Sequence, residues 1–118
     1  MHIKGITFVG TRTADQPAMA GFVRDVLGLQ PLQVKGVDAD FFALPDGTTF
    51  AVSDTGGAEP PERTVGFLVD DVEAAARELR DAGYGTDEVA TTDIHRYVHF
   101  RAPDGRLYEL VEELHPLS

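Results

Sequence analysis

The feature that most constrains the fold of this chain is an internal repeat. The tetrapeptide LPDG at residues 44–47 returns as APDG at residues 102–105, 58 positions further along. Alternating polar and apolar residues flank both turns, which is typical of β-hairpins. A glycine that can end a helix precedes each hairpin, Gly28 in the first half and Gly83 in the second. The sequence therefore predicts two copies of one supersecondary unit.

Each copy is predicted to contain a strand, a helix and then further strands. In the first copy a strand is expected over residues 6–11, followed by a helix that Asp15 caps. Apolar residues at helical spacing predict that one face of this helix is buried. These residues are Met19, Phe22, Val23, Val26 and Leu27.

In the second copy a strand is expected over residues 65–69. Its helix is predicted to begin at Asp70, which forms a capping box with Glu73, and to end at Gly83. A weaker polar strand within residues 88–92 and the second hairpin complete the unit.

These boundaries predict an α+β domain over residues 1–118. The first βαβββ unit covers residues 1–55 and the second covers residues 64–118. Residues 56–63, GGAEPPER, have the composition of a linker. Two such units can pair edge to edge into a cup-shaped curved sheet with the helices outside.

Composition excludes several classes of function. The formal net charge is −10, so the phosphates of a nucleic acid would be repelled, and cationic or neutral partners are favoured. The chain has no cysteine, which excludes disulfides and thiolate metal sites. No apolar run approaches the roughly 20 residues of a membrane span, and no signal-peptide pattern is visible, so we expect a cytoplasmic protein without a membrane partner.

The second hairpin predicts one particular pair of side chains. If it is centred near Asp104, His99 lies opposite Glu109 on the same face, with Cβ atoms roughly 5 Å apart. The same count around the first turn places Phe41 opposite Ala51. The pair of His99 and Glu109 is compatible with part of a metal site, an acid/base pair or a solvated strand face.

Strand alternation separates a concave face from a face that packs on the helices. Phe22, Phe42 and Phe67 are expected in the core. The expected cup residues are apolar in one half and polar in the other, which suits an aromatic or polycyclic ligand with a basic or hydroxylated end. We predict that the ligand is bound by Phe8, Phe41, Ala51, Thr64, Tyr97, His99, Leu107 and Glu109.

Three segments carry a resemblance to a known family: FVRDVLGL at residues 22–29, VGFLVDDVEAAARELRDAG at 65–83 and FRAPDGRLYEL at 100–110. Together with the repeat they resemble the vicinal oxygen chelate superfamily. This superfamily includes glyoxalases, extradiol dioxygenases, methylmalonyl-CoA epimerases, and bleomycin- and fosfomycin-resistance proteins. The resemblance implies the cup fold, a small-molecule ligand and a homodimer.

The resemblance also implies where metal ligands would stand: on Phe8, Ala51, Thr64 and Glu109. Of these four residues, only Glu109 has a side chain that binds a metal strongly, whereas such a site needs three or four nitrogen or oxygen donors. His95 and His99 are about 13 Å apart on an extended strand, too far for one ion. His2 and His115 are expected in solvent. We therefore expect no metal and no cofactor, although a site completed by another subunit stays an alternative.

Three classes of function follow, in order of preference. The first is a metal-free binding protein, similar to the bleomycin-resistance branch, for a cationic or aromatic small molecule. The second is a metal-dependent lyase, isomerase or dioxygenase of the glyoxalase type. The third is a metal-free enzyme in which His99 and Glu109 are the catalytic acid/base pair.

Overall fold

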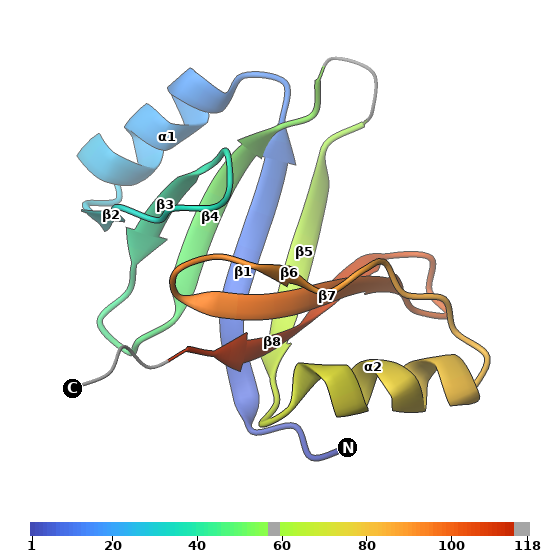
Figure 1. Cartoon of the computed structure of the whole chain (residues 1–118). Helices are drawn as coiled ribbons and strands as arrows, with labels where there is room; N and C mark the ends of the chain where they lie inside the picture. Colours follow the sequence, from blue (N-terminus) through green and yellow to red (C-terminus); the bar gives the residue numbers. More distant parts are fainter. Residues whose placement is uncertain (57–59, 115–118) are drawn as a thin grey trace.

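A computed structural model describes residues 1–56 and 60–114 of the chain (Figure 1). Within them, one sheet of eight strands has the order β2-β3-β4-β1-β5-β8-β7-β6. The elements are β1 (Gly5–Thr13), α1 (Gln16–Asp25), β2 (Gln30–Leu32), β3 (Asp40–Ala43), β4 (Thr49–Asp54), β5 (Glu62–Leu68), α2 (Val72–Asp81), β6 (Ala90–Thr91), β7 (His95–Arg101) and β8 (Leu107–Glu113). The predicted α+β fold with two βαβββ units is confirmed.

The two units join along β1 and β5, which pair antiparallel from Gly5 opposite Leu68 to Arg12 opposite Glu62. Each of these strands also pairs in parallel with the last strand of its own unit, β1 with β4 and β5 with β8. The sheet curls strongly, so that β7 and β8 run across β1 and β5 (Figure 1). Helix α1 packs on β4 and α2 packs on β7 and β8. The two units of one chain therefore form a single cup-shaped sheet with the helices outside.

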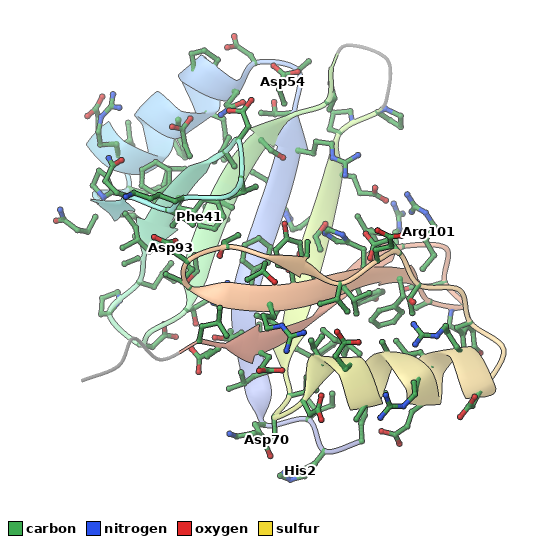
Figure 2. All side chains as sticks on the ribbon, viewed as in Figure 1. His2, Phe41, Asp54, Asp70, Asp93 and Arg101 are labelled. Atoms are coloured by element: carbon green, nitrogen blue, oxygen red, sulfur yellow. The ribbon has the colours of Figure 1, made fainter. Side chains whose placement is uncertain are left out.

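Loops from both units meet at one side of the cup. The backbone N–H of Lys35, in the loop between β2 and β3, donates to Asp93 Oδ1 at 3.1 Å. The N–H of Asp93, in the turn before β7, donates back to the carbonyl of Lys35 at 3.1 Å. Gly36 has a φ of +99° and lies so close to Thr92 that a Cβ there would be 3.1 Å from its Cα. Figure 2 shows Asp93 in this turn, on the side of the cup that carries Phe41.

The linker prediction needs a correction at its end. Strand β5 begins at Glu62, so the last two residues of the segment predicted as linker belong to the sheet. Arg12 on β1 extends the ladder to Glu62. Residues 57–59 of the segment lie outside the described residues.

Helix α1 begins where the sequence predicts, because Asp15 Oδ1 accepts a hydrogen bond from the N–H of Ala18 at 3.1 Å. Its buried face is narrower than predicted. Val23 is fully buried against β3 and β4, but Phe22 is 45% exposed, Val26 is 70% exposed and Leu27 is 55% exposed. The helix ends at Asp25, so Val26 and Leu27 lie beyond its last turn. The prediction that Phe22 belongs to the core is wrong.

Helix α2 begins one residue later than predicted. Asp71 is its N-cap and accepts from the N–H of Ala74 at 3.2 Å. Asp70 instead forms an ion pair with Lys4 at 2.8 Å, and Glu73 pairs with Arg96 at 2.9 Å. The predicted capping box of Asp70 and Glu73 is therefore wrong, because both carboxylates have cationic partners elsewhere.

The core on the helix side matches the strand alternation. Phe42 is buried under α1, and Phe67 is partly buried against the cluster under α2. Neither described helix is long and apolar enough to cross a membrane.

Candidate functional site

The concave side of the sheet holds a pocket of about 180 Å³. Seven of the eight predicted ligand-binding residues line it: Phe8, Phe41, Ala51, Thr64, Tyr97, His99 and Glu109. The lining also includes residues that the sequence analysis did not select: Gly10, Thr11, Arg12, Val37, Ala39, Ser53, Thr92 and His95. Leu107 is not part of the lining. It is the first residue of β8 and lies opposite Arg101, next to the turn.

Two strand pairs that the repeat relates occupy opposite walls of the pocket. His99 lies opposite Glu109 in the ladder of β7 and β8, and Phe41 lies opposite Ala51 in the ladder of β3 and β4. Both predicted registers are confirmed. The first pair makes one wall polar and the second makes the other wall apolar.

Phe8 forms the centre of the pocket floor. Its ring centroid is 6.2 Å from that of Phe41, and both side chains belong to a buried cluster with Ala51 and Val111. A Cβ on Gly66 would lie 2.9 Å from Phe8 Cβ, and a Cβ on Gly10 would lie 3.0 Å from Phe8 Cε2. The two glycines, one on each central strand, therefore make the space that the Phe8 ring occupies.

The polar wall is built around Glu109, which is only 4% exposed. His99 Nε2 lies 3.2 Å from Glu109 Oε2. The other ring nitrogen, Nδ1, lies 2.8 Å from Asp87 Oδ2, and the backbone N–H of His99 donates to Asp87 Oδ1 at 2.6 Å. The imidazole is thus held between two carboxylates.

Asp87 is a contact that the sequence analysis missed. It precedes β6, in a segment that the bridge between Thr86 and Phe100 attaches to β7. No periodicity or turn motif connects residue 87 with residue 99, so only the three-dimensional structure reveals this contact.

The surroundings of His99 favour its charged form. Burial lowers the pKa of His99, but hydrogen bonding and charge from Glu109 and Asp87 outweigh burial and raise that pKa above the ordinary 6.5. The ring of Tyr97 meets the His99 ring edge-on at 5.5 Å. Burial, with help from the charges of Glu109 and Asp87, raises the pKa of Tyr97, so its hydroxyl stays protonated.

His95 is the second missed residue, and its environment is the opposite of that of His99. It is 6% exposed, and burial lowers the pKa of its imidazole below 6.5. His95 shares strand parity with Tyr97 and His99, which is the signal that could have placed it in the pocket. It lies opposite Glu113, four positions along the strand from His99.

The donor set does not fit the metal that the fold family implies. The four corresponding positions lie on the four central strands, with Phe8 on β1, Ala51 on β4, Thr64 on β5 and Glu109 on β8. Phenylalanine and alanine offer no ligand atom, and a divalent ion in such a site needs three or four donors. In the part of the chain that the structure describes, no group of three or more histidine, aspartate or glutamate residues could hold a metal.

Of the two remaining histidines, only His2 is among the described residues. His2 is exposed and lies near the N-terminus, at the opposite end of the molecule from Asp54 (Figure 2). His115, which was expected in solvent, lies outside the described residues.

Solved structures with the same fold include two methylmalonyl-CoA epimerases. The enzyme from Mycobacterium tuberculosis has a TM-score of 0.74 and 20% identity, over 96% of this chain and 90% of that chain. A variant of the Streptomyces coelicolor enzyme in complex with 2-nitronate-propionyl-CoA has a TM-score of 0.72 and 20% identity, over 97% and 100%. At such identities the likeness shows the fold alone.

A dioxygenase has a similar unit within a longer chain. The 2,3-dioxygenase LapB from Pseudomonas sp. KL28 has a TM-score of 0.72 and 22% identity, over 94% of this chain but 41% of that chain. No curated protein matches the sequence.

The sequence itself supplies the assignment to a family. Residues 5–110, which run from the start of β1 into β8, match the family model described as the Glyoxalase/Bleomycin resistance protein/Dioxygenase superfamily. This match agrees with the two βαβββ units and with the structural neighbours. The chain belongs to the glyoxalase, bleomycin resistance protein and dioxygenase superfamily.

Proposed function

We propose that this protein binds a small aromatic molecule in its cup without a metal ion, as a binding protein similar to the bleomycin-resistance branch. The observation that carries the proposal is the Phe8 ring at a position where the family places a metal ligand. It packs against Phe41 and Ala51 and covers the floor with carbon atoms. Such a surface contributes area for an aromatic ring and has no atom that binds a metal.

The dimensions of the pocket support a ligand with one aromatic ring in its enclosed part. An apolar cavity of about 150 Å³ in another protein is known to hold one benzene molecule. The pocket here measures about 180 Å³. One ring with a small substituent fills that space, and any larger part of a ligand extends through the open mouth.

Glu109 is the proposed anchor for the polar end of the ligand. One of its oxygens, Oε2, lies beside His99, and among the described residues the other oxygen, Oε1, makes no hydrogen bond or ion pair. A carboxylate accepts hydrogen bonds and attracts positive charge. The ligand end at this wall is therefore a hydroxyl or an amine.

The contact between His99 and two carboxylates favours a second candidate, a metal-free enzyme that transfers protons. In that role Glu109 takes a proton from the substrate and the charged imidazole of His99 donates one, so no proton is consumed overall. Asp87 holds the ring in place for such a step. Replacement of His99 by Asn separates the two candidates. A binding protein loses modest affinity, whereas an enzyme loses turnover by a factor of about 10² to 10⁴.

Metal content tests the proposal against a metal-dependent enzyme of the glyoxalase type. We expect protein purified without added metal to contain far less than one Zn, Ni, Fe, Mn or Co per chain by elemental analysis. Added divalent ions should leave the melting temperature unchanged, because an ion that binds only the folded state would raise it. One tightly bound ion per chain would overturn the proposal. An ion bound tightly between two subunits would overturn it as well.

A thermal-shift screen of cationic aromatic molecules tests the binding itself. The Glu109→Gln variant should weaken the binding of a true ligand by about 1–3 kcal/mol, the effect of losing a charged hydrogen-bond partner. Ligands whose affinity depends on neither Glu109 nor His99 would show that this wall is only a solvated strand face.

We also propose that the protein is a homodimer. The sheet is open, and its edge strands β2 and β6 each have one side that no other described strand pairs with. Light scattering should give twice the chain mass of 12.8 kDa. A monomer at micromolar concentration would contradict this proposal.

A further inference from the structure

His95 is a buried polar side chain of the cup that the proposed anchor does not use. It lies at the start of β7 and lines the pocket beside Thr92. Its backbone N–H donates to Thr92 Oγ1 at 3.0 Å, and its carbonyl accepts from the N–H of Thr92 at 2.8 Å. Its ring meets the Phe8 ring edge-on, with centroids 6.4 Å apart and planes at 90°. The turn and the aromatic contact together fix where the imidazole points.

The ring nitrogens of His95 have no partner among the described residues. Across residues 1–56 and 60–114, neither Nδ1 nor Nε2 makes a hydrogen bond or an ion pair. Every described side-chain nitrogen or oxygen that is fully shielded from solvent does have a partner. The unpaired nitrogens of this 94% buried residue therefore open onto the pocket, where the pocket contents must satisfy them.

The charge of His95 defines what it can bind. Burial lowers the pKa of the imidazole, and the opposing charge of Glu113 does not restore it. A neutral imidazole offers one N–H donor and one acceptor nitrogen. It therefore suits a neutral group that both donates and accepts, such as a hydroxyl, and it offers no counter-charge to an ion.

The two polar positions stand at opposite ends of the aromatic floor. His95 and His99 are four residues apart on β7, or about 13 Å along an extended strand. Tyr97 lies between them and lines the same pocket. Glu109 is opposite His99 and therefore belongs to the far end.

We propose that His95 is a second ligand anchor, and that the cup binds aromatic molecules with polar groups at both ends of the ring. This inference rests on the proposed binding function and narrows its ligand class. The ring lies on Phe8 and Phe41, an amine or hydroxyl donates to Glu109, and a hydroxyl at the opposite end of the ring pairs with the neutral imidazole of His95.

Tyramine and phenethylamine test this geometry, because they differ only in the hydroxyl opposite the amine-bearing chain. Their dissociation constants are measured by NMR titration against the wild type and the variants His95→Phe, His95→Gln and Glu109→Gln. The wild type should bind tyramine about fivefold more tightly, the gain from one neutral hydrogen bond of about 1 kcal/mol. His95→Phe should bind both amines equally, at the wild-type affinity for phenethylamine.

The other two variants serve as controls. Gln at position 95 keeps a donor and an acceptor, so His95→Gln should retain part of the preference for tyramine. Glu109→Gln should weaken the binding of both amines by the same factor, because their ammonium groups are identical. Urea unfolding of each variant verifies that the cup is folded at the temperature of the titration.

The outcomes separate this inference from the proposed function. If both amines bind the wild type equally, or if the preference survives in a folded His95→Phe variant, His95 is not an anchor, while binding at Glu109 stands. If neither amine binds, both the proposed ligand class and the second anchor are wrong.

Discussion

The two hairpins of the repeat share one backbone design and carry different chemistry on their concave faces. Phe41 opposite Ala51 on β3 and β4 corresponds to His99 opposite Glu109 on β7 and β8. The backbone register is the same at both places, but one pair is apolar and the other is charged. The backbone thus decides which positions face the cup, and the side chains alone decide what the cup can bind.

The convex faces of the same hairpins remain alike. Phe42 lies opposite Phe50 under α1, and Phe100 lies opposite Tyr108 near α2. Phe42, Phe50 and Phe100 pack in the clusters beneath the helices, where the burial of apolar area stabilises the fold, and Tyr108 stacks on Phe100. In these two hairpins the difference between the units therefore lies on the concave surface.

The largest predicted effect comes from adding metal ligands to the cup. The triple variant Phe8→His, Ala51→Glu and Thr64→His would add three donors to Glu109 on the four central strands. We expect this variant to bind one Ni²⁺ or Zn²⁺ ion per chain by calorimetry. At 1,000 times the dissociation constant, the metal should stabilise the fold by about 4 kcal/mol. The same variant with Glu109→Gln should bind more weakly, and equal binding would refute the inferred ligand positions.

The next effect separates the two related pairs by stability. Phe41→Ala removes a ring that packs on Phe8, so the free energy of unfolding should fall by about 3 kcal/mol. Glu109→Gln should lower it by about 1 kcal/mol, because one hydrogen bond to a charged group is replaced by a neutral one. Urea denaturation measures both. Equal losses would mean that the polar wall supports the fold as much as the apolar wall does.

Much of this comparison was visible in the sequence, because turns and alternation determine register. The repeated PDG turn placed residues 41 and 51, and 99 and 109, opposite each other, and the structure agrees. Helix limits were less predictable. Val26 looked like part of an amphipathic face, but the helix ends at Asp25. Asp70 looked like a cap, but Lys4, which is 66 residues away, pairs with it.

The contacts of the site that the sequence did not predict are of two kinds. Asp87 reaches His99 from a loop whose path follows no periodic pattern. His95 could have been found by parity alone, since it lies two residues before Tyr97. Its burial against Phe8 depends on how the two units close on each other, and single-strand patterns do not encode that closure.

The central glycines allow a finer comparison of the two units. Gly10 on β1 faces the outer end of the Phe8 ring, whereas a Cβ on Gly66 of β5 would meet Phe8 Cβ and Val111 Cγ2, both at 2.9 Å. A ring edge can move more easily than atoms close to the backbone. Gly66→Ala should therefore cost about 2 kcal/mol of unfolding free energy, and Gly10→Ala should cost less.

Gly85→Ala serves as the control for both glycine variants, because nothing lies within 4 Å of a Cβ at that position. It should change stability by no more than about 0.5 kcal/mol. A larger loss of unfolding free energy for Gly10→Ala than for Gly66→Ala would contradict the inferred packing, in which Gly10 faces the outer end of the Phe8 ring and Gly66 faces its Cβ.

The smallest predicted effect is a difference in pH dependence between the two histidines of β7. The pKa of His99 is raised in the folded protein, so its stabilising contribution is complete below about pH 6.5 and disappears as the pH rises through the folded pKa. The pKa of His95 is lowered by burial. Its titration therefore does not affect stability above about pH 6.5, and it destabilises the fold increasingly as the pH falls toward the folded pKa. Relative to the wild type, His99→Gln should therefore lose stability as the pH falls, whereas His95→Gln should gain it. Urea unfolding between about pH 5 and pH 9 measures both differences. Parallel pH profiles for the two variants would show that the carboxylates around His99 do not hold it in a different charge state from His95.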